Sequence, residues 1–213
     1  MPDFQIFIQS LSVSSMWAIL KKLKNAFSFV TVQRFFVLQL ETIQEAGPKI
    51  PITVLRYDIV QKCPRETLRK IKGETKDWVR RWLRGDICYV ACADKEPVAH
   101  VWICHGEWRL KDKDEGRPLP QRCAFLYDAR TREQWRGNRV YQTLISRSAS
   151  DLLTRGYESL YLLVSDLDFA AQHAPEKIGF QRTEHCIVFY RFLKLFKFRS
   201  DRVTLLAGLA SSE

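Results

Sequence analysis

This 213-residue sequence lacks the spacings that mark metal and disulfide frameworks. Its six cysteines form no Cys-x-x-Cys pair, and its four histidines show no metal-ligand spacing with them. Four of the cysteines fall inside apolar, strand-like runs, where a buried free thiol is the usual state. The sequence therefore predicts no bound metal. Free thiols also indicate a reducing compartment, so we expect a cytoplasmic protein.

Long apolar runs, internal repeats and low-complexity tracts are also missing. No stretch approaches the roughly 20 apolar residues that a membrane-spanning helix needs. The first twenty residues lack a basic start and are interrupted by glutamines and serines, so they do not resemble a secretory signal. Hydrophobic residues make up 46% of the chain, which is enough for one domain with a sizeable core.

Positive charge, by contrast, is in clear excess, with a formal net charge of +10. Such a balance favours an anionic partner: a phosphorylated cofactor, a membrane surface or a nucleic acid. The basic residues are dispersed along the chain, and no nucleic-acid-binding motif is recognisable. A nucleic acid is therefore the least favoured partner of the three.

Residues 13–30 carry apolar side chains at helical spacing. We expect residues 1–33 to form an amphipathic helical extension. This extension either packs on the parent domain or makes peripheral contact with an anionic membrane, and both readings stay open. The apolar stripe consists of Val13, Met16, Trp17, Leu20, Leu23 and Phe27.

The rest of the chain alternates between strand-like and helix-like patterns. A few antiparallel strands are followed by strand–helix–strand and then by helix–strand. This order predicts an α/β (α+β layered) domain with a mixed sheet over residues 34–199, and a tail over 200–213. Strands are expected at 34–41, 52–57, 87–93, 97–104, 122–130, 159–165 and 184–192, and helices from Pro64 and at 75–84, 138–155 and 168–177.

The helix expected at about 75–84 has an amphipathic pattern that separates aromatic and aliphatic side chains from basic ones. The pattern predicts that Trp78, Val79, Trp82 and Leu83 are buried and that Lys76, Arg80, Arg81 and Arg84 are exposed.

Residues 122–141 are the most informative stretch, because they predict a buried strand, a basic turn and then a helix. Such a helix start directs several backbone N–H groups and the positive end of the helix dipole at one spot, which suits a phosphate or pyrophosphate. Arg136 and Arg139 flank the turn and add charge. The alternative is an ordinary strand–turn–helix with a solvated basic edge.

Three landmarks, in this order and spacing, resemble the GNAT superfamily of acyl-CoA-dependent N-acyltransferases. Residues 127–141 are similar to the family's strand ending in R-G-x-G-x-G, residues 160–164 to a buried central strand, and residues 168–180 to its N-x-A-S-…-Y-x-K-x-G-F segment. The resemblance covers roughly residues 52–192. It implies a mixed, mostly antiparallel sheet flanked by helices, with splayed central strands.

The resemblance also implies an activity and a set of binding residues. The protein would move an acetyl or other acyl group from acetyl-CoA or another acyl-CoA to a primary amine of a small polar acceptor, by direct attack. The acceptor site would be built from residues 64–84 and the loop at 109–121. The residues expected along the pantetheine arm are Ala129, Arg130 and Thr131, and those expected around the pyrophosphate are Gln134, Trp135, Arg136, Gly137, Asn138, Arg139, Val140 and Tyr141.

The sequence departs from the family's pattern at several positions. Arg139 and Tyr141 stand where the pattern has glycines, and the tyrosine that often acts as general acid falls at Pro175. Asp168 and Ala171 replace the usual Asn and Ser. These differences leave open a non-catalytic GNAT-like module that binds a partner, and a homodimer is left open as well.

Direct attack also needs a group that takes the proton of the amine. Asp128 is the candidate general base, because it lies on the strand beside the expected acyl site. The alternative is a strand-end carboxylate that is paired with a neighbouring arginine. His105 and Glu107, at the end of the preceding strand, are weaker candidates.

Overall fold

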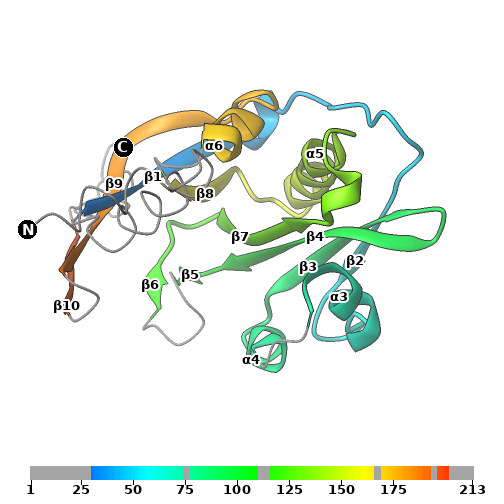
Figure 1. The fold of residues 1–213 in the computed structure, drawn as a ribbon, viewed down its shortest axis with the longest axis horizontal. Coiled ribbons are helices and arrows are strands. Elements are labelled where there is room, and N and C mark those ends of the chain that lie inside the picture. The colour runs from blue at the N-terminus through cyan, green and yellow to red at the C-terminus, as the bar shows by residue number, and fades with distance from the viewer. Residues whose placement is uncertain (1–29, 74–76, 110–115, 166–168, 193–195, 202–213) are drawn as a thin grey trace, which may run out of the picture.

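The computed structural model describes residues 30–73, 77–109, 116–165, 169–192 and 196–201 (Figure 1). The helices are α3 (Arg65–Lys72), α4 (Trp78–Leu83), α5 (Val140–Thr154) and α6 (Phe169–Glu176), with short 3-10 turns η1 (Leu40–Thr42) and η2 (Glu133–Trp135). The strands are β1 (Val30–Gln39), β2 (Thr53–Tyr57), β3 (Ile87–Ala93), β4 (Glu96–His105), β5 (Glu107–Trp108), β6 (Arg117–Pro118), β7 (Cys123–Thr131), β8 (Ser159–Ser165), β9 (Gln181–Phe192) and β10 (Phe196–Asp201).

Eight of the strands form one sheet, in the order β10-β9-β1-β8-β7-β4-β3-β2. Every neighbouring pair is antiparallel except β7 and β8, which run parallel and are joined by α5. The predicted mixed, mostly antiparallel sheet flanked by helices is therefore confirmed. Strand β1 lies between β8 and β9, a position that no local pattern in the sequence could indicate.

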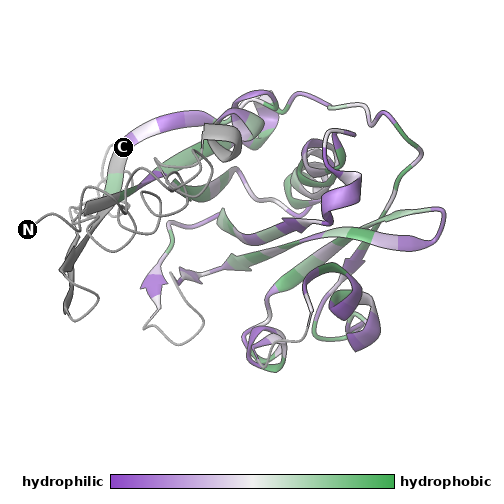
Figure 2. Ribbon diagram, in the orientation of Figure 1, coloured by the Kyte–Doolittle hydropathy of each residue, from purple (hydrophilic) through white to green (hydrophobic). Residues whose placement is uncertain are grey.

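Helices cover both faces of the sheet (Figure 1). Helix α5 packs against the strands on one face through a large aliphatic core that includes Leu144, Ile145 and Leu152. On the other face, α3 and α4 cover a second, aromatic cluster that contains Trp82 and Trp102, whose ring centroids are 4.5 Å apart. Figure 2 shows hydrophobic residues along the central strands, as expected of a sheet buried on both faces.

A third cluster lies under the two-stranded ribbon formed by β5 and β6. Trp108 of β5 meets Phe35 of β1 and Phe125 of β7, with ring centroids 5.3 Å from each. The sequence analysis did not predict this ribbon, because two-residue strands carry too short a pattern to be recognised.

Local signals in the sequence mark the ends of several elements. Pro64 and Gly73 are the caps of α3, and Gly73 has a φ of 82° that favours glycine. Asp94 and Lys95 connect β3 and β4 with positive φ values of 47° and 65°, as a tight hairpin requires. Helix α5 ends just before Gly156, as expected.

The predicted exposure of α4 is wrong at three positions. Arg81 is only 4% exposed, whereas Val79 and Leu83 are 66% and 73% exposed. The guanidinium of Arg81 lies 5.0 Å from the ring centroids of both Trp102 and Tyr127. It is buried because it forms an ion pair with the Asp128 carboxylate on β7. The prediction failed because a hydropathy pattern treats every arginine as a surface residue.

The predicted N-terminal helical extension, residues 1–33, falls on residues that the structure does not describe, except for residues 30–33, which belong to β1 and are not helical. Strand β1 thus starts four residues before the expected 34. At the other end, Ser200 and Asp201 belong to β10 rather than to the expected tail. Within the described residues, none of the helices has the length and apolarity needed to span a membrane.

Candidate functional site

Strands β7 and β8 separate part-way along their length. Their parallel pairing runs from Cys123 and Ser159 to Leu126 and Leu162, and then stops although both strands continue. The wedge between the two strands opens into a pocket of about 1290 Å³. The splayed central strands implied by the family resemblance are therefore present, and they form two walls of this pocket.

A bulge on β7 faces the wedge. Strand β4 places one residue, Val101, between His100 and Trp102, whereas β7 places both Asp128 and Ala129 between their partners. Asp128 has a φ of 46°, a left-handed conformation that Asp tolerates better than most residues. An extra residue of this kind bends the strand and leaves backbone groups out of the hydrogen-bond ladder with β4. The bulge therefore changes the direction of β7 at the point where the pocket begins.

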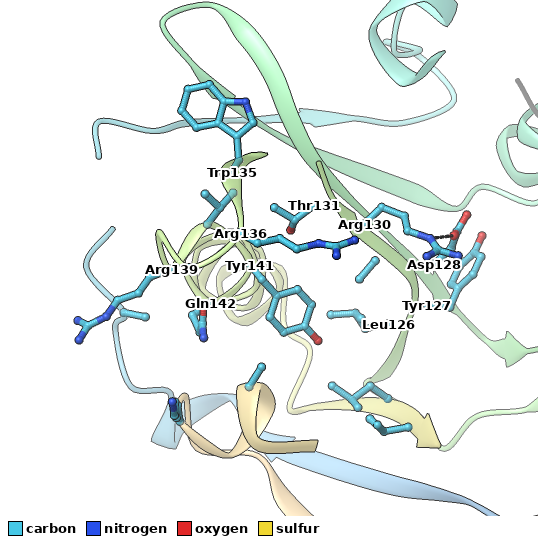
Figure 3. Close-up of a pocket in the computed structure, with 18 of the residues that line it drawn as sticks. Leu126, Tyr127, Asp128, Arg130, Thr131, Trp135, Arg136, Arg139, Tyr141 and Gln142 are labelled. Carbon is cyan, nitrogen blue, oxygen red and sulfur yellow. Dashed lines mark ion pairs between the residues drawn. The ribbon is translucent and has the colours of Figure 1, made fainter. Parts of the chain in front are cut away.

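The start of α5 forms the opposite end of the pocket (Figure 3). Gly137 has a φ of 80°, and Arg139, the N-cap residue, has φ 59° and ψ 19°. The side chain of Arg139 does not cap the helix, so it accepts no hydrogen bond from the first backbone N–H groups of α5. Arg139 stands where the family's pattern has a glycine, and it has a left-handed backbone that glycine adopts readily.

The residues expected around acyl-CoA are brought together in one place. All of them line the pocket except Gln134 and Asn138. The Asn138 carbonyl accepts a hydrogen bond from the Lys49 N–H at 3.2 Å, so this residue holds the turn in place instead. The roles of these residues in binding stay predictions. The lining residues of that set are Ala129, Arg130, Thr131, Trp135, Arg136, Gly137, Arg139, Val140 and Tyr141.

The N-terminal part of the chain supplies a wall that the sequence analysis missed. Residues 45–47 and Lys49 line the pocket beside α5, and Gln33 reaches it from β1. The Thr143 hydroxyl ties this segment to the first turn of α5 by donating to the Ala46 carbonyl at 2.9 Å. No sequence signal could have revealed the wall, because it depends on where β1 enters the sheet.

Positive charge dominates the pocket. Its lining contains two carboxylates, Glu45 and Asp128, against five cationic side chains. An anion would therefore be attracted into it, most of all at the start of α5, where the helix dipole adds to the charge. The cationic side chains are Lys49, Arg130, Arg136, Arg139 and Lys177.

Asp128, the candidate general base, is enclosed by cations. Its carboxylate accepts hydrogen bonds from the Lys72 ammonium at 2.5 and 2.6 Å and from the Arg81 guanidinium at 2.6 Å. Arg130 lies 3.9 Å away (Figure 3). Burial on its own would raise the pKa of Asp128, but Arg81 and Lys72 outweigh burial and hold that pKa below its usual value. The general-base role stays a prediction, and this environment favours the alternative of an ion-paired carboxylate.

Two tyrosines line the pocket and differ in their partners. The Tyr127 hydroxyl donates to the Asp86 carboxylate at 2.6 Å, and Arg84 lies 2.7 Å from the same oxygen. Among the described residues, the Tyr141 hydroxyl has no such partner, and Figure 3 shows it projecting from α5 into the pocket toward Leu126. Burial raises the pKa of Tyr141, so this hydroxyl keeps its proton and can donate a hydrogen bond.

The weaker candidates lie elsewhere. His105 pairs with Ala124, at the end of β7 that is far from the bulge, and its ring meets Tyr157. Glu107 forms an ion pair with Arg109. Neither lines the pocket, so the structure does not place them at the site. The part of the chain that the structure describes also holds no group of three or more His, Cys, Asp or Glu residues able to bind a metal.

Residues 57–180 match the model of the acetyltransferase (GNAT) family. This chain belongs to that family. The match begins at the end of β2 and ends after α6, so it contains both diverging strands and the start of α5 but leaves out β1. Membership of the GNAT family supports acyl transfer as the class of reaction. No curated protein matches the sequence significantly.

Solved GNAT structures share the fold at low sequence identity. A GCN5-related N-acetyltransferase from Kribbella flavida is 9% identical with a TM-score of 0.51, over 81% of this chain and 62% of that one. The IAA acetyltransferase from Bacillus cereus is 13% identical with a TM-score of 0.50, over 68% of this chain and 86% of that one. The chain spans about 54% to 63% of the length of the first structures that it matches. These similarities show the fold alone.

The ion pairs of Asp128 lead to a stability prediction. Asp128→Asn should lower the free energy of unfolding at pH 7 by about 3 kcal/mol, since it removes the carboxylate that forms an ion pair with the buried Arg81. Because the native pKa of Asp128 lies below its unfolded value, the stabilisation is present above about pH 4 and fades as the pH falls further. Urea unfolding of both proteins at several pH values measures the difference.

The matched control is Glu66→Gln, which removes an exposed ion pair with Arg69 on α3. That change should cost less than about 1 kcal/mol, as surface ion pairs usually do. An equal effect of the two substitutions would show that the cluster around Asp128 adds no special stability.

Proposed function

We propose that this protein is an N-acyltransferase, which moves an acetyl or other acyl group from acyl-CoA to a primary amine of a small polar acceptor. The observation that carries the proposal is the continuous pocket from the start of α5 to the bulge at Asp128. Its two ends suit the two ends of an acyl-CoA molecule, which carries phosphates at one end and a thioester at the other. The free thiols of all six cysteines support the proposed cytoplasmic location.

The phosphate end of the pocket fits an extended, polyanionic ligand. The start of α5 lines the pocket, so its first backbone N–H groups are available to a bound phosphate, and Arg136 has a side chain that is 65% exposed. Among the described residues, Arg136 forms a distant ion pair with Glu133, at 3.8 Å, which a phosphate can displace. The left-handed backbone at Gly137 and Arg139 keeps the turn open without a run of glycines.

The facing edges of β7 and β8 fit the pantetheine arm, which joins the phosphates of acyl-CoA to its thioester. Beyond Leu126 and Leu162, each strand has an edge that the other no longer pairs with. Amide groups of an extended ligand can bind such edges as an additional strand would. When bound, acyl-CoA would supply a thioester carbonyl whose carbon a neutral amine attacks, with release of the thiol.

The chain's own residues can assist that attack at the bulge. Backbone groups that leave the ladder at Asp128 and Ala129 are available to donate a hydrogen bond where negative charge develops on the carbonyl oxygen. The turn pattern predicts Tyr141 at the pyrophosphate, but its hydroxyl projects from α5 toward Leu126, where β7 and β8 diverge (Figure 3). We therefore also propose that this hydroxyl donates a hydrogen bond to the departing sulfur. Because burial raises its pKa, Tyr141 stabilises the thiolate as a donor rather than by giving up its proton, which water then supplies.

The first prediction concerns binding of the co-substrate. CoA should bind the protein with micromolar affinity, and Arg136→Ala should weaken binding about tenfold, the loss expected for one charge-assisted phosphate contact. Isothermal titration calorimetry measures both values. Arg155→Ala, which removes the same charge just after the far end of α5, is the control and should leave affinity unchanged. Absence of heat at millimolar CoA would overturn the proposed function.

A second prediction concerns the altered turn. Arg139→Gly should keep the fold, since glycine adopts a φ of 59° without strain. CoA affinity should stay equal or fall, with a flatter dependence on salt, because one cation near the phosphates is lost. Calorimetry at three salt concentrations provides the measurement. A clear rise in affinity would show that Arg139 obstructs the pocket and would favour a non-catalytic binding module.

A third prediction concerns the leaving thiol. Tyr141→Phe should lower kcat by at least about tenfold while the KM for acetyl-CoA and the melting temperature stay unchanged, since only a hydrogen bond made late in the reaction is removed. Thiol release with the best amine acceptor gives these constants. Tyr157→Phe, outside the pocket, is the control. Full activity of Tyr141→Phe would assign protonation of the thiol to another group.

A further inference from the structure

The segment at residues 44–49, which leads from η1 toward β2, is held along the first two turns of α5. At one end, the Ser146 hydroxyl donates a hydrogen bond to the Gln44 carbonyl at 3.4 Å. At the other end, the Lys49 N–H donates to the Asn138 carbonyl at 3.2 Å. The segment therefore runs antiparallel to the helix and brings Lys49 beside the turn that starts α5.

A buried threonine ties the middle of this segment to the same turn. Thr143 is 2% exposed, and its hydroxyl lies 2.9 Å from the carbonyl oxygens of both Ala46 and Arg139. Pro48 directly precedes Lys49, and its ring limits the freedom of the backbone there. The backbones of Lys49 and Arg139 are therefore held next to each other at one edge of the pocket.

The side chains of these two residues carry positive charges that no ion pair neutralises within the described part of the chain. Lys49 and Arg139 both line the pocket. Glu45, the carboxylate of the same segment, lines it too but pairs with neither of them. Arg130 and Arg136, in contrast, lie 3.9 and 3.8 Å from carboxylates. Lys49 and Arg139 are therefore open to an anionic ligand.

The position of these cations suits the outer part of an acyl-CoA molecule. Figure 3 shows the Arg139 side chain directed away from Tyr141 and from the wedge between the strands. A ligand with its thioester arm in the wedge and its pyrophosphate at the start of α5 would continue past the helix start. The group that follows the pyrophosphate in CoA is a ribose that carries a 3′-phosphate, which would meet the side of the pocket with Lys49 and Arg139.

Neither cation belongs to the pattern that resembles the family. Lys49 lies outside residues 57–180, which match the family model, and Arg139 stands where the pattern has a glycine. The start of α5 already offers backbone N–H groups to one phosphate group. Two further cations beside it therefore suit a second, separate phosphate.

We propose that Lys49 and Arg139 bind the 3′-phosphate of the donor's nucleotide. The inference rests on the proposed function and names the part of the donor that this chain selects. Charge-assisted hydrogen bonds from an ammonium and a guanidinium to phosphate oxygens are strong and favour a doubly charged group. The donor is then coenzyme A itself, because the phosphopantetheine arm of an acyl carrier protein has no nucleotide.

Three ligands that share the pantetheine arm test the proposal by isothermal titration calorimetry. CoA carries the 3′-phosphate, 3′-dephospho-CoA lacks only this group, and 4′-phosphopantetheine lacks the whole nucleotide. CoA should bind at least about tenfold more tightly than dephospho-CoA, which corresponds to about 1.4 kcal/mol. The difference should shrink as salt is added, because both cations are accessible to solvent ions.

Substitution at Lys49 links this preference to the segment. Lys49→Gln should weaken CoA binding several-fold and leave the affinity for dephospho-CoA unchanged, and Lys49→Arg should keep the preference. Lys70→Gln, which changes an exposed lysine on α3 outside the pocket, should alter neither affinity. A merely structural role of Lys49 would instead weaken both ligands equally and lower the melting temperature.

Arg139→Gly should reduce the preference for CoA over dephospho-CoA in the same way. Equal affinities of the unaltered protein for these two ligands overturn the proposal while the acyltransferase function stands. An unchanged preference in both Lys49→Gln and Arg139→Gly also overturns it. Equal kcat/KM values for acetyl-phosphopantetheine and acetyl-CoA would overturn it in favour of a carrier protein as donor. If none of the three ligands binds, the proposed function falls as well.

Discussion

The end of the pairing between β7 and β8 is the constraint on which the rest of this structure depends. The two strands are held together from Cys123 to Leu126 and then diverge, although each continues for several residues. Strand β7 is drawn away by its bulge against β4, and β8 stays in register with β1. The wedge between them makes the pocket, and the turn that follows β7 sets the start of α5 at its mouth. Without this divergence β7 and β8 would stay paired along their whole length, and no pocket would open between them.

The bulge in turn depends on the buried ion cluster beneath it. A left-handed Asp128 costs conformational energy, and a buried carboxylate costs desolvation energy, so neither is expected without compensation. Lys72 and Arg81 provide it, because helices α3 and α4 bring both cations to the same oxygen pair. An apolar replacement of comparable shape could be equally stable, so stability alone does not explain why charges are used here.

Local patterns were sufficient to predict the strand–turn–helix at 127–141, because one short segment contains both the strand and the start of the helix. The exposure of α4 was predicted wrongly, since the fate of Arg81 is decided by Asp128, 47 residues further along the chain. The wall formed by residues 45–49 was missed for a related reason. Its place follows from the insertion of β1 between β8 and β9, a long-range pairing that periodicity does not encode. Sequence reasoning thus located the pocket residues at the start of α5 better than the cations that surround Asp128.

The missing glycines of the family's pattern bear on whether this pocket is still a working site. A glycine in such a turn has two uses, a left-handed backbone and the absence of a side chain. Arg139 keeps the first, because its φ of 59° is one that glycine would adopt, and its side chain lies at the rim of the pocket (Figure 3). Tyr141 gives up the second, since its ring occupies space inside the pocket. The turn therefore keeps the left-handed backbone at Arg139 but not the free space at Tyr141.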